Sequence, residues 1–305
     1  MAAKLVVTGA NSALGRVLIE RALLRPDVEL AALVRSARAE SELPPLPRER
    51  ARAVRVAWSD AAGLRDACAG ATGLIHLAGI LIESRTTDYR EANVETARAA
   101  VDAARAAGVA KLVLVSAVGA DPESPNPYWR TKAEAEALVR QSGLAYTILR
   151  CPIVLACASA GVRALAREVG SPFVPLPGGG ANLEQPIDAR DLSDGALNAA
   201  LSVACARDVT LDSVGPESLP LRELIHRGAR LRGKSPMIVP VPTALLRALL
   251  ALRTQLLGPG FSPAVIEVML ADARFDPAPA AKALGITLRP LDDTLRYSLE
   301  LASAA

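Results

Sequence analysis

The chain has 305 residues, which is enough for one large domain or a main domain with a C-terminal elaboration, and 51% of them are apolar against 22% charged. This balance excludes a disordered chain, and a net charge of only +3 without dense basic runs speaks against nucleic acid as a partner. The four cysteines lack metal-ligand spacing, so no metal site is predicted and free thiols in a reducing compartment are expected. Because no signal-peptide pattern and no apolar run of membrane-spanning length occur, we expect a cytoplasmic protein.

The first predicted strand, residues 4–8, ends in a turn of small residues that leads into a helix over residues 17–24. Backbone N–H groups and the positive helix dipole at such a turn bind the pyrophosphate of a dinucleotide, although a bare strand–helix connection is the alternative. Gly9 would allow the tight turn, Gly15 would let the helix lie close to the strand, and the Ser12 hydroxyl could donate to a phosphate. The predicted cofactor contacts in this turn are Gly9, Asn11, Ser12, Ala13, Leu14, Gly15 and Arg16.

Short apolar strands then alternate with segments of helical period. Strands are predicted at 29–34, 54–58, 73–79, 111–116 and 145–150, and helices at 60–69, 93–107 and 128–142. This alternation, with strands that are apolar throughout, predicts a doubly wound α/β fold in which a parallel sheet is covered on both faces. Ligands bind beyond the carboxyl ends of such strands, so the residues that follow the strands should share one site.

Two residues that follow strands bear on the choice of cofactor. Arg35 follows the second strand, where an acidic residue would accept bonds from a ribose 2′-hydroxyl and an arginine suits a 2′-phosphate. NADP(H) is therefore favoured, with NAD(H) still possible; Arg16 and Arg38 could assist, and a merely solvated arginine is the alternative. Asp60, after the third strand, could accept from the adenine amino group, cap the following helix, or do both.

Tyr128 and Lys132 are the predicted catalytic pair. Four residues apart on a helix, they would lie on one face. A nearby ammonium lowers the pKa of a phenol from about 10 and prepares it for proton exchange with a carbonyl or an alcohol. The same ammonium can hold the ribose hydroxyls of the nicotinamide. This spacing is frequent by chance, but its position after the fifth strand favours a functional pair.

These segments resemble the short-chain dehydrogenase/reductase superfamily, in the extended and atypical branches that include a complex I subunit and NmrA-like proteins. The resemblance rests on Thr8–Arg16, Asp60, His76–Gly79, Asn93–Thr96, Ser116 and Tyr128–Lys132, and it extends through Gln185–Leu192. It implies a dinucleotide-binding Rossmann core over residues 1–155. A small mixed C-terminal region over residues 156–305, interleaved with the core, would cover the substrate.

The resemblance also implies residue roles. Tyr128 would be the general acid/base, Lys132 would bind the ribose and lower the tyrosine pKa, and Ser116 would hydrogen-bond the substrate oxygen. Relatives often have a second hydroxyl residue where this chain has Ala117, so Ser124 is a substitute for Ser116. The family's Arg-Pro sequence is interrupted by a cysteine. Further cofactor contacts are expected at Ala78, Gly79, Cys151, Pro152 and Val154.

The C-terminal part has a less regular pattern. Residues 171–180 are predicted to be a loop, as a lid or a pocket rim, and residues 243–257 and 263–273 to be helices with wide apolar faces. Those faces would pack within the C-terminal region, form an apolar substrate channel or contact a membrane surface as a peripheral protein does. The small number of aromatic residues, and of charged residues in positions that look buried, favours an apolar carbonyl substrate over a nucleotide sugar.

We therefore expect an NADPH-dependent reductase that transfers hydride to a carbonyl or conjugated carbonyl of an apolar small molecule, as a monomer or a homodimer. The same parts would serve an NAD(P)-dependent epimerase or isomerase. A third hypothesis is a non-catalytic NAD(P)-binding subunit or sensor. It is favoured by the sequences Ser116–Ala117 and Cys151–Pro152 and disfavoured by the retained Tyr128 and Lys132.

Overall fold

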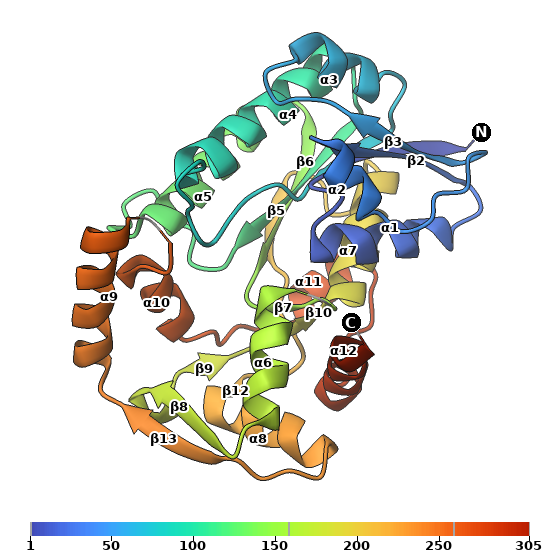
Figure 1. Cartoon of the computed structure of the whole chain (residues 1–305). Helices are drawn as coiled ribbons and strands as arrows, with labels where there is room; N and C mark the ends of the chain where they lie inside the picture. Colours follow the sequence, from blue (N-terminus) through green and yellow to red (C-terminus); the bar gives the residue numbers. More distant parts are fainter. Residues whose placement is uncertain (1, 158, 259, 305) are drawn as a thin grey trace.

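The centre of the fold is a parallel β-sheet (Figure 1) in a computed structural model that describes residues 2–157, 159–258 and 260–304. Over these ranges the sheet has seven strands, in the spatial order β11 (Val209–Asp212), β6 (Ala145–Cys151), β5 (Lys111–Ala117), β4 (Gly73–His76), β1 (Ala3–Thr8), β2 (Val28–Val34) and β3 (Ala51–Arg55). All neighbouring strands are parallel. From β3 the chain crosses back to place β4 beside β1, so the predicted doubly wound Rossmann fold is confirmed.

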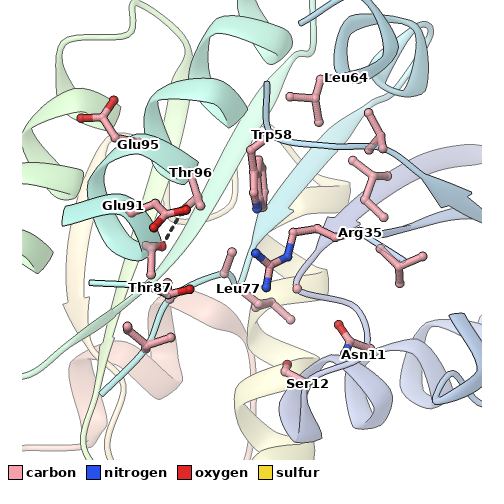
Figure 2. A pocket seen from close by; sticks show the side chains of 18 residues that line it. Asn11, Ser12, Arg35, Trp58, Leu64, Leu77, Thr87, Glu91, Glu95 and Thr96 are labelled. Carbon is pink, nitrogen blue, oxygen red and sulfur yellow. Dashed lines mark hydrogen bonds between the residues drawn. The ribbon is translucent and has the colours of Figure 1, made fainter. Parts of the chain in front are cut away.

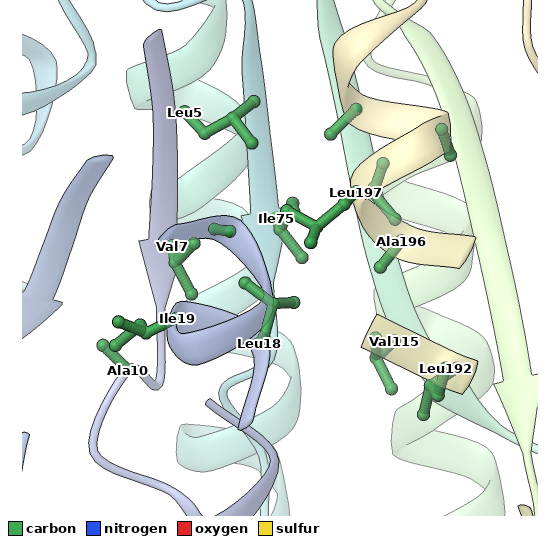
Figure 3. Close-up of a cluster of buried hydrophobic side chains, with 14 of the residues drawn as sticks. Leu5, Val7, Ala10, Leu18, Ile19, Ile75, Val115, Leu192, Ala196 and Leu197 are labelled. Atoms are coloured by element: carbon green, nitrogen blue, oxygen red, sulfur yellow. The ribbon is translucent and has the colours of Figure 1, made fainter. Parts of the chain in front are cut away.

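Helices cover both faces of this sheet. One face is covered by α1 (Ala13–Leu23), α7 (Ala189–Leu201) and α11 (Ala278–Leu284), and the other by α3 (Ala61–Cys68), α4 (Thr96–Ala106) and α5 (Pro127–Arg140). Figure 3 shows the first layer, where Leu18 and Leu197 pack near Ile75 of β4. Because successive strand residues point to opposite faces and both faces are buried, the central strands consist mostly of apolar residues.

The remaining elements gather around a separate hydrophobic cluster built by α6 (Ala160–Gly170), α8 (Leu221–Leu231) and α12 (Leu291–Ala304). Three short strand pairs accompany it: β7 (Val154–Leu155) with β10 (Ile187–Asp188), β9 (Leu183–Glu184) with β12 (Leu219–Pro220), and β8 (Phe173–Pro177) with β13 (Met237–Val241). Two helices, α9 (Thr243–Leu257) and α10 (Pro263–Leu270), lie at one edge of the molecule (Figure 1). In the described ranges, every helix falls short of the length and apolarity that a bilayer span requires.

Several predicted elements differ from the structure. The strand predicted at 54–58 is β3 at Ala51–Arg55, because β2 ends at Val34, the partner of Arg55, and offers no backbone beyond it. The loop predicted at 171–180 contains β8 and a 3₁₀ turn, η2 (Gly178–Gly180). The helix predicted at 93–107 begins earlier as a π-helix, η1 (Arg90–Glu95), and the short helix α2 (Ala37–Ser41) was not predicted.

Candidate functional site

The turn after β1 has the geometry of a phosphate cradle. Gly9 has φ of +66°, which glycine adopts readily, and a Cβ there would lie 3.0 Å from the backbone nitrogen of Ala78. A Cβ on Gly15 would lie 2.5 Å from the carbonyl oxygen of Gly9, so this glycine lets α1 approach the turn. Ser12 caps α1 by accepting a hydrogen bond from the Gly15 nitrogen at 3.0 Å, which leaves its own O–H free to donate. These residues fit a bound pyrophosphate.

A cavity of about 260 Å³ lies at the carboxyl ends of β1, β2 and β4 (Figure 2). Among the predicted cofactor contacts, the structure brings together around it Gly9, Asn11, Ser12, Arg35, Ala78 and Gly79. In Figure 2 the Arg35 side chain extends into the space between Trp58 and Ser12. The Trp58 ring in turn packs edge-on against the buried His76 ring, with centroids 5.7 Å apart.

The cavity wall also contains residues that the sequence interpretation missed. They are Leu33, Val34, Val56, Trp58, Leu64, Leu77, Ile80, Thr87, Glu91, Ala92, Glu95 and Thr96. Trp58 could have been found, because it is the last residue of the strand predicted at 54–58, and the end of a strand is in position to line a ligand site. The two glutamates had no comparable signal, since they lie on helical segments whose side chains face the cavity only once the sheet has formed.

Three other predicted cofactor residues, Arg16, Arg38 and Asp60, do not line this cavity. Asp60 caps α3, where its carboxylate accepts a hydrogen bond from the Gly63 nitrogen at 2.9 Å, as the capping alternative proposed. The Arg38 side chain is 91% exposed and pairs with Glu42. Glu42 also accepts a hydrogen bond from Asn11 at 2.9 Å, which is the main cause of its lowered pKa.

Five further predicted cofactor contacts lie near the start of α1 and the end of β6. Ala13, Leu14 and Val154 pack around one small buried cluster. Cys151 ends β6 and Pro152 follows it directly. The Cys151 thiol donates to the carbonyl oxygen of Ser116 at 3.2 Å, and burial raises its pKa to about 11.

Tyr128 and Lys132 lie one turn apart on α5. Asn126 caps this helix by accepting a hydrogen bond from the Tyr128 nitrogen at 3.0 Å. The Lys132 ammonium donates to the carbonyl oxygen of Val115 at 3.1 Å. Its Nζ also lies 3.6 Å from the position that a Cβ on Gly79 would take. Lys132 therefore adjoins the cavity through Gly79, which is part of the cavity wall.

The electrostatics of this pair differ from the expectation. Burial raises the pKa of Tyr128, and the neighbouring Cys151 and Tyr89 raise it further. Burial also lowers the pKa of Lys132. Burial therefore outweighs the lowering of the tyrosine pKa that was expected from Lys132, whose ammonium is bound to the Val115 carbonyl. The phenol of Tyr128 therefore stays protonated at neutral pH.

The Ser116 hydroxyl is engaged elsewhere. It donates to Glu136 at 2.7 Å, and this fully buried carboxylate also accepts hydrogen bonds from Arg150 and Arg140. Burial opposes ionisation of Glu136, but these hydrogen bonds outweigh it and the net pKa is lowered. The substitute, Ser124, accepts a hydrogen bond from the Asn126 nitrogen at 3.2 Å. Neither serine lines the cavity.

A contact from the C-terminal region reaches the same helix. The Asn126 side chain donates to the carbonyl oxygen of Ala264 at 2.9 Å and to the carboxylate of Glu267 at 3.0 Å. Both partners lie on α10, so this helix is fastened to α5 two residues before Tyr128. Sequence reasoning missed this contact, because the partners are far apart in the chain and each is an ordinary helix residue.

A family model described as NAD(P)H-binding matches residues 9–172, which is more than half of the chain. An NAD(P)H azoreductase of Xenophilus azovorans is 28% identical over 70% of this chain and 69% of its own length. A ceramide reductase of Caulobacter vibrioides is 36% identical over 48% of this chain, and a mitochondrial NADH dehydrogenase subunit of Arabidopsis thaliana is 26% identical over 64%. The chain spans about half the length of these last two relatives, 45% and 49% respectively.

Solved structures with the same fold include an NADPH-dependent quinone oxidoreductase of Escherichia coli in complex with NADPH. The TM-score is 0.72 and the sequence identity 20%, and the match covers 96% of this chain and 99% of that one. Another is MoeE5 in complex with UDP-glucose and NAD, at a TM-score of 0.74, 20% identity and coverage of 99% of both chains. At this identity they show the fold alone. The sequence match, the phosphate cradle and the sheet order agree: the chain belongs to the NAD(P)H-binding family, in the atypical branch of the short-chain dehydrogenases/reductases.

Proposed function

We propose that this chain is an NADPH-dependent reductase that acts on a carbonyl or conjugated carbonyl group of an apolar small molecule. The observation that carries the proposal is the placement of Tyr128 and Lys132 on one face of α5, with the Lys132 ammonium beside Gly79 in the cavity wall. Relatives named as an azoreductase and a ceramide reductase support a reductase in general terms.

The residues present fit NADPH. Gly9, Gly15 and Ser12 would hold the pyrophosphate, and Lys132 would bind the nicotinamide ribose. Arg35 offers an exposed guanidinium on the cavity wall, suited to bidentate bonds with a 2′-phosphate. When bound, the reduced nicotinamide supplies the hydride.

Tyr128 supplies the proton. Burial keeps its phenol protonated, so it can donate to the substrate oxygen as the carbonyl carbon gains the hydride. Lys132, one turn along the helix, would stabilise the phenolate that remains. Ser116 would have to break its hydrogen bond with Glu136 to orient the substrate oxygen. Tyr128 alone is therefore proposed as the proton donor.

The test is NADPH oxidation with a panel of apolar ketones and enones. Tyr128→Phe should lower turnover at least about a hundredfold, the lower end of what a positioned acid contributes, with NADPH binding unchanged. Tyr89→Phe is the matched control, since this tyrosine packs edge-on against Tyr128 but donates its hydroxyl to the carbonyl of Leu81. Equal turnover by wild type and Tyr128→Phe would contradict the assigned role.

A second candidate is a non-catalytic NAD(P)-binding subunit or sensor. The observation in its favour is that Ser116 is bound to Glu136 and Lys132 to the Val115 carbonyl. A relative named as a subunit of NADH dehydrogenase is compatible with it. Tight NADPH binding with no turnover of any compound in the panel would favour this candidate over the reductase.

A further inference from the structure

Helix α9 exposes a stripe of leucines that no part of the described structure covers. Leu245, Leu249, Leu252 and Leu256 are 54%, 56%, 53% and 72% exposed. Their spacing of four, three and four residues places all four on one face of the helix. Leu246 and Leu250 lie on a different face and are partly buried. The stripe is therefore additional to the residues that hold α9 in place.

Exposed apolar residues continue on the strand that precedes this helix. Met237 and Val239 of β13 are 62% and 40% exposed, and Phe173, the register partner of Met237 on β8, is 59% exposed. Strand β13 leads into α9 through Pro242, and the two elements follow one another along the outer edge of the molecule in Figure 1. We call these seven residues the apolar edge: Phe173, Met237, Val239, Leu245, Leu249, Leu252 and Leu256. Exposed apolar residues gathered in this way mark interaction sites.

The charge of the surrounding segment indicates which kind of partner fits this apolar surface. Residues 224–266 contain no aspartate or glutamate, whereas they contain six cations: Arg227, Arg230, Arg232, Lys234, Arg247 and Arg253. Arg227 and Arg230 form ion pairs with acidic residues outside the segment. Lys234, just before β13, is exposed, and Arg247 is exposed on the side of α9 away from the leucines. The segment that contains six of the seven apolar residues described above carries only positive charges, which is complementary to an anionic lipid bilayer.

A second copy of the chain fits this surface less well. In a two-fold symmetric dimer the same patch meets itself, so the cations of one acid-free segment would face those of the other. No carboxylate within residues 224–266 could offset that repulsion.

The apolar edge is also joined to the catalytic helix. Helix α10 follows α9, and its Ala264 and Glu267 hold Asn126, the cap of α5. Tyr128 lies two residues beyond that cap. A surface bound to the apolar edge would therefore lie against the elements that adjoin Tyr128.

We propose that the apolar edge docks this protein peripherally on an anionic bilayer, with the α9 leucines in the lipid interface, and that the apolar substrate enters from that bilayer. The second half rests on the proposed reductase function; the docking itself does not. Leucines in the interface provide apolar burial, and Lys234, three residues before Met237, adds attraction to anionic headgroups that salt weakens.

The experiment is co-sedimentation of the full chain with vesicles of phosphatidylcholine alone, or of phosphatidylcholine mixed equally with phosphatidylglycerol. We expect binding to the anionic vesicles, weaker binding at high salt, and a loss of at least about tenfold in the partition coefficient for the double variant Leu249→Gln with Leu252→Gln. Leu24→Gln is the matched control, since this leucine is 70% exposed but follows α1.

Two results would overturn the docking: wild type that stays in the supernatant with both vesicle types, or equal binding by wild type and the double variant. A wild-type dimer that the double variant converts to a monomer, without vesicle binding, would assign the apolar edge to a second copy. NADPH binding and turnover of a water-soluble ketone, measured on the same variants, separate this proposal from the reductase proposal. Vesicle binding without turnover contradicts only the reductase, and turnover without vesicle binding contradicts only the docking.

Discussion

At the scale of single residues, Arg35 is the proposed determinant of the choice between NADPH and NADH. Its side chain lines the cavity and no acidic residue occupies its place after β2. Arg35→Ala should weaken NADPH binding about tenfold and leave NADH binding unchanged. The reason is that a hydrogen bond to a charged group contributes ~1.5 kcal/mol at an exposed position. Fluorescence titration of both cofactors measures this difference.

Arg38→Ala is the matched control for Arg35. Arg38 is three residues away, 91% exposed and paired with Glu42, and it does not line the cavity. We expect its replacement to change NADPH binding by less than about twofold, because exposed pairs contribute little. Equal losses of NADPH affinity in the two variants would mean that the general positive charge of this loop attracts the 2′-phosphate and that the guanidinium of Arg35 does not bind it specifically.

At the scale of elements, Glu136 fastens α5 to its sheet. From the middle of the helix it binds Ser116 on β5 and Arg150 on β6. Glu136→Gln should lower the free energy of unfolding by about 2–3 kcal/mol at pH 7. This loss is smaller than for a fully buried ion pair, because the side chains of Arg150 and Arg140 are 26% and 39% exposed. Denaturant unfolding measures it, with Glu134→Gln, a partly exposed neighbour on α5, as the control.

The pH dependence of that loss has a definite sign. The folded-state pKa of Glu136 lies below its ordinary value of 4.5, so its stabilisation is complete above that pH and is lost as the pH falls through the folded pKa. The difference between wild type and Glu136→Gln should therefore shrink in acid. A difference that stayed constant down to pH 3 would show that packing, and not the ionised carboxylate, makes the contribution.

Elements held by local patterns were predictable, and elements held by distant partners were not. Strands such as β5 have a continuous apolar run, and α9 was predicted with the bounds that the structure has. Strand β8 contains Pro175 and Pro177, which hide a strand pattern, and it exists because β13, far along the chain, pairs with it. The bounds of β3 follow from where β2 ends, which the sequence of β3 does not encode.

At the scale of the whole molecule, the candidate site could be predicted only in part. The rule that ligands bind beyond strand ends placed Gly9, Arg35 and Gly79 correctly around one cavity, because parallel strands bring their carboxyl ends to one edge. Asp60 also follows a strand, yet its carboxylate caps α3. The link from α10 to Asn126 depends on how the C-terminal region folds back, and no local pattern signals it.

The change of the free energy of unfolding with falling pH is a property of the whole molecule. Two groups, His76 and Glu184, affect it in opposite directions. Burial lowers the pKa of His76 to about 3, so the unfolded chain binds a proton that the folded chain does not between about pH 6.5 and 3. Stability therefore falls as the pH falls through this window. Burial raises the pKa of Glu184 to about 7, so between about pH 7 and 4.5 the folded chain binds the extra proton and stability rises as the pH falls.

Between pH 6.5 and 4.5 these two contributions oppose each other, and we expect the free energy of unfolding to vary little there from this pair. In Glu184→Gln the His76 contribution is no longer offset, so stability should fall by about 1.4 kcal/mol per pH unit from pH 6.5 downwards, relative to wild type. Denaturant unfolding at pH 6.5, 5.5 and 4.5 measures the slope, and Glu29→Gln removes the same charge at an exposed site of β2 as the control. If the slope of Glu184→Gln matches that of wild type, Glu184 is ionised in the folded protein at these pH values and does not offset the contribution of His76.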